Sequence, residues 1–282
     1  MADKSSDSIA ERSQARESYN LGYPQEVLGF FSQRSAEHQA AFLLPYLRHG
    51  MRLLDCGCGP GSITTDLAGR VAPGEVVGVD VDSTQVEIAR SRAVRLGVGD
   101  VRFEVASVHE LPFADEAFDA ALSHGVVEHL SEPVAALSEI RRVLKPGGIL
   151  GVRHADLGGH LFAPEDPLCE EFFRLYALVS RAGGGDPSFG RHQVAALLAA
   201  GFTRLAPSAS YDCWTETPET TARAAAAMSA LLTSSPLAER AIELGLANRA
   251  ALEASAEAFR QWSGNPAAFA AEAWCEAVAW KD

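Results

Sequence analysis

The feature that most restricts the fold is an apolar run that passes directly into a glycine-rich turn. Residues 53–61 read LLDCGCGPG, and a stretch with helical periodicity starts at Ser62. Glycine is required where a backbone turns through positive φ or lies against a ligand, and the start of the following helix offers unpaired N–H groups. The next apolar run ends at Asp80, 23 positions after Gly57, where a carboxylate at a strand end can accept both hydroxyls of a ribose. Together the two features predict a nucleoside-type ligand.

Short apolar runs alternate with helical stretches between Arg52 and His154, which is typical of βαβ units around a parallel sheet. The expected strands are nearly all apolar, as strands covered on both faces require: 52–56, 76–80, 101–105, 118–123 and 149–154. The expected helices are 62–68, 83–96 and 133–144, with Ser83 and Ser131 as N-caps and 146–148 as a stop before the next strand. The sequence therefore predicts an α/β fold.

Segments outside this core are mostly helical. One or two amphipathic helices are expected over 24–47, helices over 167–182 and 191–200, a sixth strand over 203–213, and Ala-rich helices over 218–263 with a break at Pro236. The segment 272–280 fits either a last strand or a helix end, because alanine favours helix while topology can override it. The expected division is an N-terminal helical lid (1–48), a core (49–213) with a helical insertion at about 156–186, a helical cap (214–268) and the last strand of the core (269–282).

Charge and composition exclude several classes of protein. Lys and Arg number 24 against 37 Asp and Glu, a net charge of −13 that repels a phosphate backbone, so no nucleic-acid partner is expected. No apolar run approaches the length of a membrane span, and the first residues are too polar for a signal peptide, so the prediction is a cytoplasmic protein, monomeric or homodimeric. The five cysteines are expected as free thiols, and Cys56-x-Cys58 lacks the spacing of a zinc or redox motif.

Four segments in order carry a family resemblance. They are LLDCGCGPGSIT (53–64), VVGVDVD (76–82), HELPFADEAFDAALSHGVVEHL (109–130) and EIRRVLKPGGIL (139–150). They resemble the ordered motifs of the class I S-adenosylmethionine-dependent methyltransferases, in the UbiE-like small-molecule subgroup, over about 43–154 with a weaker echo through 191–213. The resemblance implies a Rossmann-like, seven-stranded, mostly parallel sheet with an antiparallel last strand. It also implies S-adenosyl-L-methionine as cofactor, S-adenosyl-L-homocysteine as product, and a small-molecule acceptor methylated at O, N or C.

The same resemblance implies which residues hold the cofactor. The glycines would approach its methionine end, Asp80 its ribose, and the residue after Asp80 its adenine. At the adenine edge the family usually has an Asp, and here Ser107 provides only a hydroxyl, a weaker partner. The positions implied are Asp55, Gly57, Gly59, Asp80, Val81, Ser107, Val108 and Ser123.

Three histidines are candidates for positioning or deprotonating the acceptor. His124, His129 and His154 are all expected at or just beyond the carboxyl edge of the sheet, where open α/β folds bind ligands. A general base is needed only if the acceptor loses a proton. The spacing His154-x-Asp156-x-x-x-His160 could also bind a metal, although loop His and Asp are usually solvated, and no metal is predicted.

Aromatic residues outside the core are the candidates for contact with the acceptor. Tyr19 and Tyr23 stand in a polar N-terminal segment that could fold over the cofactor, while Trp214 and the segment 167–182 offer apolar surface. These rings could equally form the core of a lid or a dimer contact. The hypothesis they support is a largely apolar acceptor, such as a natural-product or quinone-like scaffold.

Three alternatives stay open. A protein of the same fold could bind the cofactor and catalyse a cyclisation or rearrangement, or could bind it without turnover. A nicotinamide-dependent dehydrogenase is the third, but the last glycine of its G-x-G-x-x-G fingerprint would fall at Ser62, Pro60 lies inside the turn, and Asp55 would face a pyrophosphate. The loop therefore favours a cationic amino-acid nucleoside.

Overall fold

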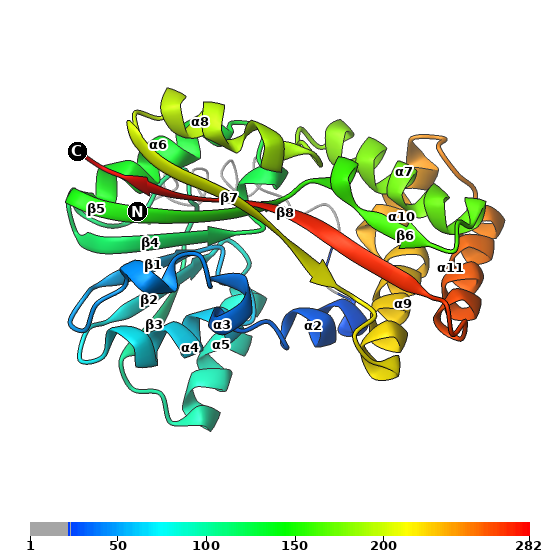
Figure 1. Cartoon of the computed structure of the whole chain (residues 1–282), viewed down its shortest axis with the longest axis horizontal. Helices are drawn as coiled ribbons and strands as arrows, with labels where there is room; N and C mark the ends of the chain where they lie inside the picture. Colours follow the sequence, from blue (N-terminus) through cyan, green and yellow to red (C-terminus); the bar gives the residue numbers. More distant parts are fainter. Residues whose placement is uncertain (1–21, 23) are drawn as a thin grey trace, which may run out of the picture.

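A mixed eight-stranded sheet forms the centre of the molecule (Figure 1). The computed structural model describes residue 22 and residues 24–282, so Tyr19 and Tyr23 lie outside the described residues. The strands follow the order β3-β2-β1-β4-β5-β8-β6, and β7 also pairs with β8. Their bounds are β1 Leu53–Cys56, β2 Val76–Asp80, β3 Val101–Val105, β4 Phe118–His124, β5 Leu144–Ala155, β6 Leu161–Ala163, β7 Arg204–Cys213 and β8 Phe269–Trp280.

Strand directions confirm the predicted Rossmann-like sheet. The strands β1 to β5 pair in parallel, whereas β8 runs antiparallel to β5, β6 and β7. The segment 272–280, left open between strand and helix, is therefore a strand, because its neighbours on both sides supply the ladder that alanine alone would not favour. The short β6 extends the sheet beyond the end of β5, so the described part of the chain has eight strands where seven were expected.

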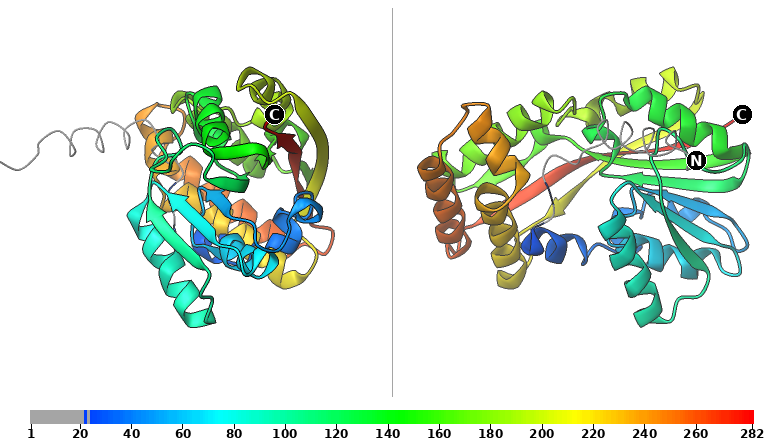
Figure 2. Two further views of the ribbon diagram at one scale, coloured as in Figure 1. Left: turned by 90° about the vertical axis from the view of Figure 1, so that its left-hand side faces the viewer. Right: turned by 180° about the vertical axis from the view of Figure 1, so that it is seen from behind.

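Helices cover both faces of the sheet. Alternate residues of β1 point to opposite faces: Leu54 and Cys56 pack with the helices α6 and α8, and Leu53 packs with α3 and α4. Figure 2 shows these two layers from the end and from behind. The helical segments are α2 Gln25–Phe31, α3 Ala36–Gln39, η1 Leu44–Tyr46, α4 Ser62–Val71, α5 Ser83–Leu96, η2 Val127–His129, α6 Pro133–Val143, η3 Leu157–Gly159, α7 Pro167–Ala182, η4 Phe189–His192, α8 Gln193–Ala199, α9 Pro218–Thr233, α10 Pro236–Glu243 and α11 Arg249–Ser263.

Two predicted helix caps are wrong by one residue. The N-cap of α5 is Asp82, whose carboxylate accepts from the Thr84 N–H at 2.7 Å, and not Ser83. The helix α6 starts at Pro133, so its N-cap is Glu132 and not Ser131, because proline is favoured at the first helical position. The segment 146–148 does not separate helix from strand either, since it lies within β5.

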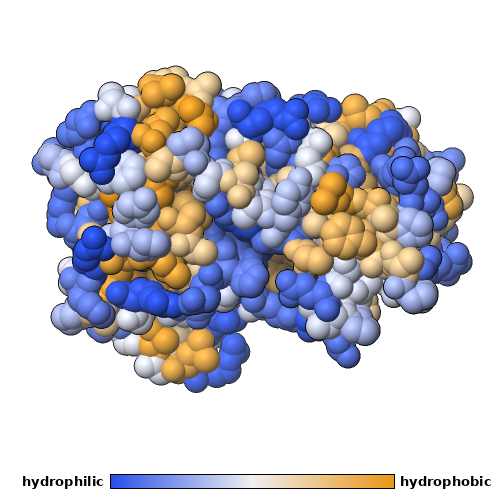
Figure 3. All heavy atoms as spheres, viewed as in Figure 1, coloured by the Kyte–Doolittle hydropathy of each residue, from blue (hydrophilic) through white to orange (hydrophobic). Residues whose placement is uncertain are grey.

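A second helical layer lies beside the sheet, on the right of Figure 1. The helices α2, α7, α9, α10 and α11 share one apolar cluster, in which the Phe172 and Phe259 rings meet edge to face at 5.5 Å. The strands β7 and β8 extend from the sheet toward this layer. The face of the molecule seen in Figure 3 is largely hydrophilic, with separate apolar patches. No helix among the described residues is long and apolar enough to cross a membrane.

Candidate functional site

The glycine turn lies at the carboxyl edge of the sheet, between β1 and α4. Gly57 and Gly59 have φ of 74° and 50°, in the left-handed region that favours glycine. A Cβ at Gly57 would lie 2.2 Å from the Val126 side chain, whereas a Cβ at Gly59 would meet no heavy atom within 4 Å. The turn at Gly57 is thus required by packing, and Gly59 presents backbone to open space into which a ligand fits.

Two carboxylates flank the turn. Asp80, at the end of β2, accepts from the Gly59 N–H at 2.9 Å and from the Asp82 N–H at 2.9 Å. Asp55, at the end of β1, accepts from the Thr64 hydroxyl at 2.6 Å. Burial raises the pKa of Asp55 to about 6, which the Thr64 hydrogen bond opposes and the charge of Asp80 reinforces. These contacts fix the backbone of the turn and the Asp80 carboxylate in one orientation.

One pocket joins this turn to the helical layer. The predicted residues that line it are Asp55, Gly57, Gly59, Asp80, Val81, Val108, His124, His129 and Trp214. The described lining residues do not include Ser107, Ser123 or His154. Ser107 instead accepts from the His109 N–H at 3.0 Å, which leaves its neighbour Val108 on the wall.

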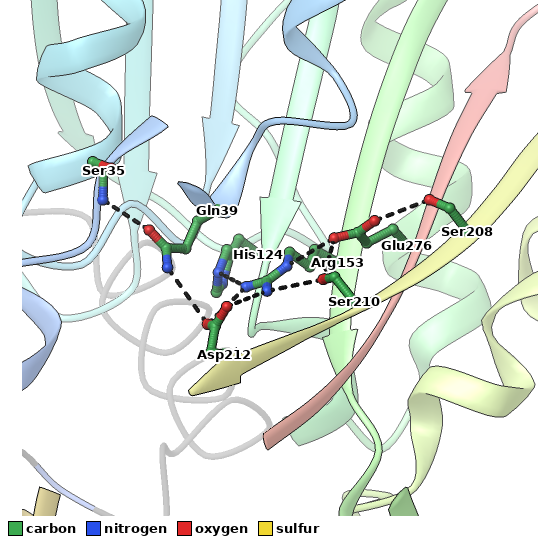
Figure 4. A network of polar contacts seen from close by, with 8 residues as sticks. All are labelled: Ser35, Gln39, His124, Arg153, Ser208, Ser210, Asp212 and Glu276. Atoms are coloured by element: carbon green, nitrogen blue, oxygen red, sulfur yellow. Dashed lines mark hydrogen bonds and ion pairs between the residues drawn. The ribbon is translucent and has the colours of Figure 1, made fainter. Parts of the chain in front are cut away.

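At the end of β4, His124 is held by a row of polar residues across the sheet (Figure 4). In register, His124 on β4 faces Arg153 on β5, and Arg153 faces Glu276 on β8. Arg153, only 1% exposed, forms ion pairs with Asp212 at 2.7 Å and with Glu276 at 3.1 Å. Its Nη1 lies 3.1 Å from His124 Nε2. Burial and the charges of Arg34 and Arg153 lower the pKa of His124 well below its usual value, so the ring is neutral.

Glu128 is a buried carboxyl on the pocket wall that the sequence analysis did not single out. Its Oε1 accepts from the Ala155 N–H at 3.4 Å, and its Oε2 has no hydrogen-bond partner among the described residues. Burial raises the pKa of Glu128 to about 8. His154 lies behind it, with Nε2 3.8 Å from Glu128 Oε2 and Nδ1 3.0 Å from Gln193 Oε1. The predicted histidine thus faces Glu128 and is buried away from the pocket.

Three other charged or titratable groups line the same end of the pocket. Burial raises the pKa of Glu272, on β8, to about 7, although the charge of Arg34 opposes the shift. Burial likewise lowers the pKa of His129 to about 4. The Arg34 guanidinium lies 4.2 Å from the centre of the Phe31 ring and 5.7 Å from that of Trp274. This end is therefore polar, partly desolvated and close to neutral in charge.

The three residues considered above as metal ligands, His154, Asp156 and His160, do not come together around one point. Asp156 is paired with the Arg191 guanidinium at 2.6 Å, His154 contacts Gln193, and the His160 ring stacks on Phe173 at 4.2 Å. Within the part of the chain that the structure describes, no group of three or more His, Cys, Asp or Glu is placed to hold a metal ion.

The rest of the pocket is apolar, and we call it the apolar chamber. It is lined mainly by aromatic and aliphatic side chains from α2, α7, α9 and the loop between β7 and α9: Phe30, Phe31, Phe172, Phe173, Trp214 and Met228. Trp214 is 8% exposed and meets Phe30 edge to face at 6.4 Å. The glycine turn and the polar residues around His124 and Glu128 line the same pocket.

These observations define a Rossmann-like protein with a nucleoside-type turn at the carboxyl edge of its sheet and an adjoining apolar chamber. The family described as methyltransferase domain matches residues 54–152. The chain thus carries a methyltransferase domain over these residues, similar to the class I S-adenosylmethionine-dependent methyltransferases.

Individual relatives agree with this assignment. An uncharacterized methyltransferase of Schizosaccharomyces pombe is 31% identical over 179 residues, covering 61% of this chain and 64% of that protein, less than two thirds of its length. The crystal structure of YcgJ from Bacillus subtilis has a TM-score of 0.56 at 22% identity over 87% of this chain and 99% of that one. The [4+2]-cyclase SpnF has a TM-score of 0.54 at 25% identity, with 89% and 84% covered. The structural likenesses show the fold.

The wall residues that were not predicted from the sequence include Arg34, Glu128, Glu272 and Trp274, all at the polar end. Glu128 was within reach, because it directly precedes His129 in the segment that follows β4. Glu272 and Trp274 belong to the segment whose conformation was left open, and only its strand register places Trp274 beside Ala155 of β5 and Glu272 beside Asp212 of β7.

Proposed function

We propose that the chain binds S-adenosylmethionine at the glycine turn and transfers its methyl group to a small, largely apolar acceptor in the apolar chamber. The observation that carries this proposal is one pocket that joins Gly59, Asp80 and Val81 to the aromatic side chains of the helical layer. The methyl donor at the glycine turn and the methyl acceptor in the apolar chamber would meet beside His124.

The residues of the turn fit the cofactor. Each carboxylate oxygen can accept more than one hydrogen bond, so Asp80, held by the Gly59 and Asp82 N–H groups, is oriented to receive ribose hydroxyls. The open space at Gly59 accommodates a ligand against the backbone. When bound, the cofactor supplies a methyl group on a positively charged sulfur. The chain then has to align the acceptor with that methyl group and exclude water.

The apolar chamber supports the choice of acceptor. Its rings bury apolar surface and expel water, which favours a molecule with a largely apolar body. Phe172 and Phe173 on α7 and Trp214 after β7 are among the aromatic residues that line it. Tyr23 and Tyr19 remain predictions for contact with the ligand.

Titration calorimetry with S-adenosylmethionine and S-adenosylhomocysteine tests the cofactor site. We expect binding by the wild type and its loss in Asp80→Ala and Gly59→Ala. Gly97→Ala is the matched control, because Gly97 also has positive φ, 68°, and open space around its Cβ position, but ends α5 away from the pocket. Equal affinity in Gly59→Ala and Gly97→Ala would contradict a ligand at the turn.

The likeness to a [4+2]-cyclase keeps one alternative in view, a cyclisation or rearrangement in which the cofactor is bound but not consumed. Mass spectrometry of the products distinguishes the two. Methyl transfer gives a product in which one methyl group replaces one hydrogen, together with S-adenosylhomocysteine. A rearranged product of unchanged mass would replace the proposed function with the alternative.

A further inference from the structure

Four residues of the pocket wall carry a buried polar atom without a partner among the described residues: Nδ1 of His124, Oε2 of Glu128, and Nε1 of Trp214 and of Trp274. At the polar end, His124 Nδ1 is a hydrogen-bond donor and Glu128 Oε2 an acceptor. Unpaired polar atoms in such positions are costly. Because both residues line the pocket, a bound ligand is the natural partner for each atom.

The tautomer of His124 follows from its neighbour. An arginine side chain can only donate hydrogen bonds, so Arg153 Nη1, 3.1 Å away, donates to His124 Nε2. The neutral ring therefore carries its proton on Nδ1, and that N–H is the unpaired donor. His124 in this state can orient an oxygen of the ligand, but its basic lone pair is already in use by Arg153.

Glu128 has the opposite character. Gln193 Oε1 accepts from His154 Nδ1 at 3.0 Å, which leaves the lone pair of His154 on Nε2, facing Glu128 Oε2 at 3.8 Å. A proton that arrives on Oε2 thus finds an acceptor lone pair behind it. The other charged groups near Glu128 are Glu272 and Arg34, whose effects on its pKa oppose each other.

Resting on the proposed methyl transfer, we propose that Glu128 accepts the proton of a hydroxyl group on a flat apolar acceptor, such as a phenol, while the His124 Nδ1–H orients the same oxygen. The O–H bond breaks as Glu128 Oε2 takes the proton. The oxygen lone pair forms the new bond to the methyl carbon, and the electron pair of the S–CH₃ bond returns to sulfur. Charge then balances, because a carboxylate and a sulfonium become a carboxylic acid and a thioether.

The donor and acceptor pair favours a hydroxyl over an ammonium group. A hydroxyl donates to Glu128 and accepts from His124, whereas an ammonium has no lone pair and leaves the His124 N–H unpaired. A positive acceptor would also meet the charge of Arg34, which lines the same end of the pocket. A carboxyl whose pKa burial raises to about 8 suits a phenol, because general bases work best near the operating pH.

The test measures the affinity of naphthol for the protein saturated with S-adenosylhomocysteine, by calorimetry between pH 6 and 9. Ionised Glu128 accepts the hydroxyl proton in a charge-assisted hydrogen bond, so affinity should rise about tenfold as pH passes the Glu128 pKa of about 8. Methoxynaphthalene, which lacks the donor, should show no such rise. Glu128→Gln should bind naphthol with an affinity independent of pH.

Glu272→Gln is the matched variant, since it removes a second carboxyl from the same wall. It should keep the rise but shift it to lower pH, because the charge of Glu272 raises the pKa of Glu128. A flat naphthol profile in the wild type, a rise that persists in Glu128→Gln, absent naphthol binding, or tighter binding of naphthylmethylamine would each overturn the inference. Failure of S-adenosylhomocysteine to bind would instead refute the proposed function itself. The comparison of naphthol with methoxynaphthalene needs only the wild type, so it decides the matter even if a variant fails to fold.

Discussion

Replacing Arg153 by Met should destabilise the fold strongly, because it leaves one buried carboxylate, Glu276, and one half-buried carboxylate, Asp212, without their partner. Arg153 donates to Asp212 at 2.7 Å and to Glu276 at 3.1 Å, and its guanidinium lies 4.4 Å from the centre of the Trp274 ring. Removing one partner of a buried ion pair costs about 3–5 kcal/mol. For a chain of this size that corresponds to a fall of about 5–15 °C in melting temperature.

Urea unfolding and thermal melting measure the loss. Arg174→Met is the control, since Arg174 pairs with Glu171 one turn away on α7 with 48% of its side chain exposed, and such surface pairs contribute about 1 kcal/mol or less. Adding Glu276→Gln to Arg153→Met should recover part of the loss, because one unpaired charge disappears. The reasoning is refuted if Arg153→Met and Arg174→Met lower stability equally, or if Glu276→Gln lowers it further.

Three other predictions concern pH, the turn and the helical layer. Burial raises the pKa of Glu128 from 4.5 to about 8, so the folded state binds this proton more tightly than the unfolded state, and the stability of the fold decreases as pH rises between these values. In urea unfolding, Glu128→Gln should therefore be more stable than the wild type at pH 8 but not at pH 4. Equal differences in stability at the two pH values would contradict this. Gly57→Ala should lower the melting temperature more than Gly59→Ala, because only the first Cβ meets the Val126 side chain. Phe259→Ala should cost about 3–5 kcal/mol in urea unfolding, and a loss no larger than that of the exposed Phe269→Ala would argue against the shared apolar cluster.

Local sequence patterns predicted the limits of a strand or helix correctly where turn-forming residues mark its ends. The strands β2 Val76–Asp80 and β3 Val101–Val105 coincide with their predicted limits, because each is a short run that follows a glycine-containing turn. The break between α9 and α10 falls at Pro236, as expected, since proline cannot continue the ladder of a helix. The turn at Gly57 and the carboxylate of Asp80 were likewise placed correctly on the pocket wall.

Long-range pairing explains what could not be predicted. The three residues of β6 form a strand only because β8 extends past the end of β5 and offers them a ladder. The partners of His124 and His154 come from distant segments, Arg153 from the neighbouring strand and Gln193 from α8. Neither the tautomer of a histidine nor the side of the sheet on which it lies can be obtained from periodicity, so the candidate bases can be told apart only when these contacts are known.

The regular spacing along β8 makes the site depend on the alignment of a single strand. Glu272, Trp274 and Glu276 are two residues apart and therefore share one face. The residues between them, Ala273 and Cys275, point to the other face. Inserting or deleting one residue just before Glu272 would exchange the two faces. Arg153 would then lie opposite a cysteine or an alanine, and Glu276 would move to the face on which Ala277 and Ala279 pack in the apolar core, so a length change in β8 should damage the site and the fold together.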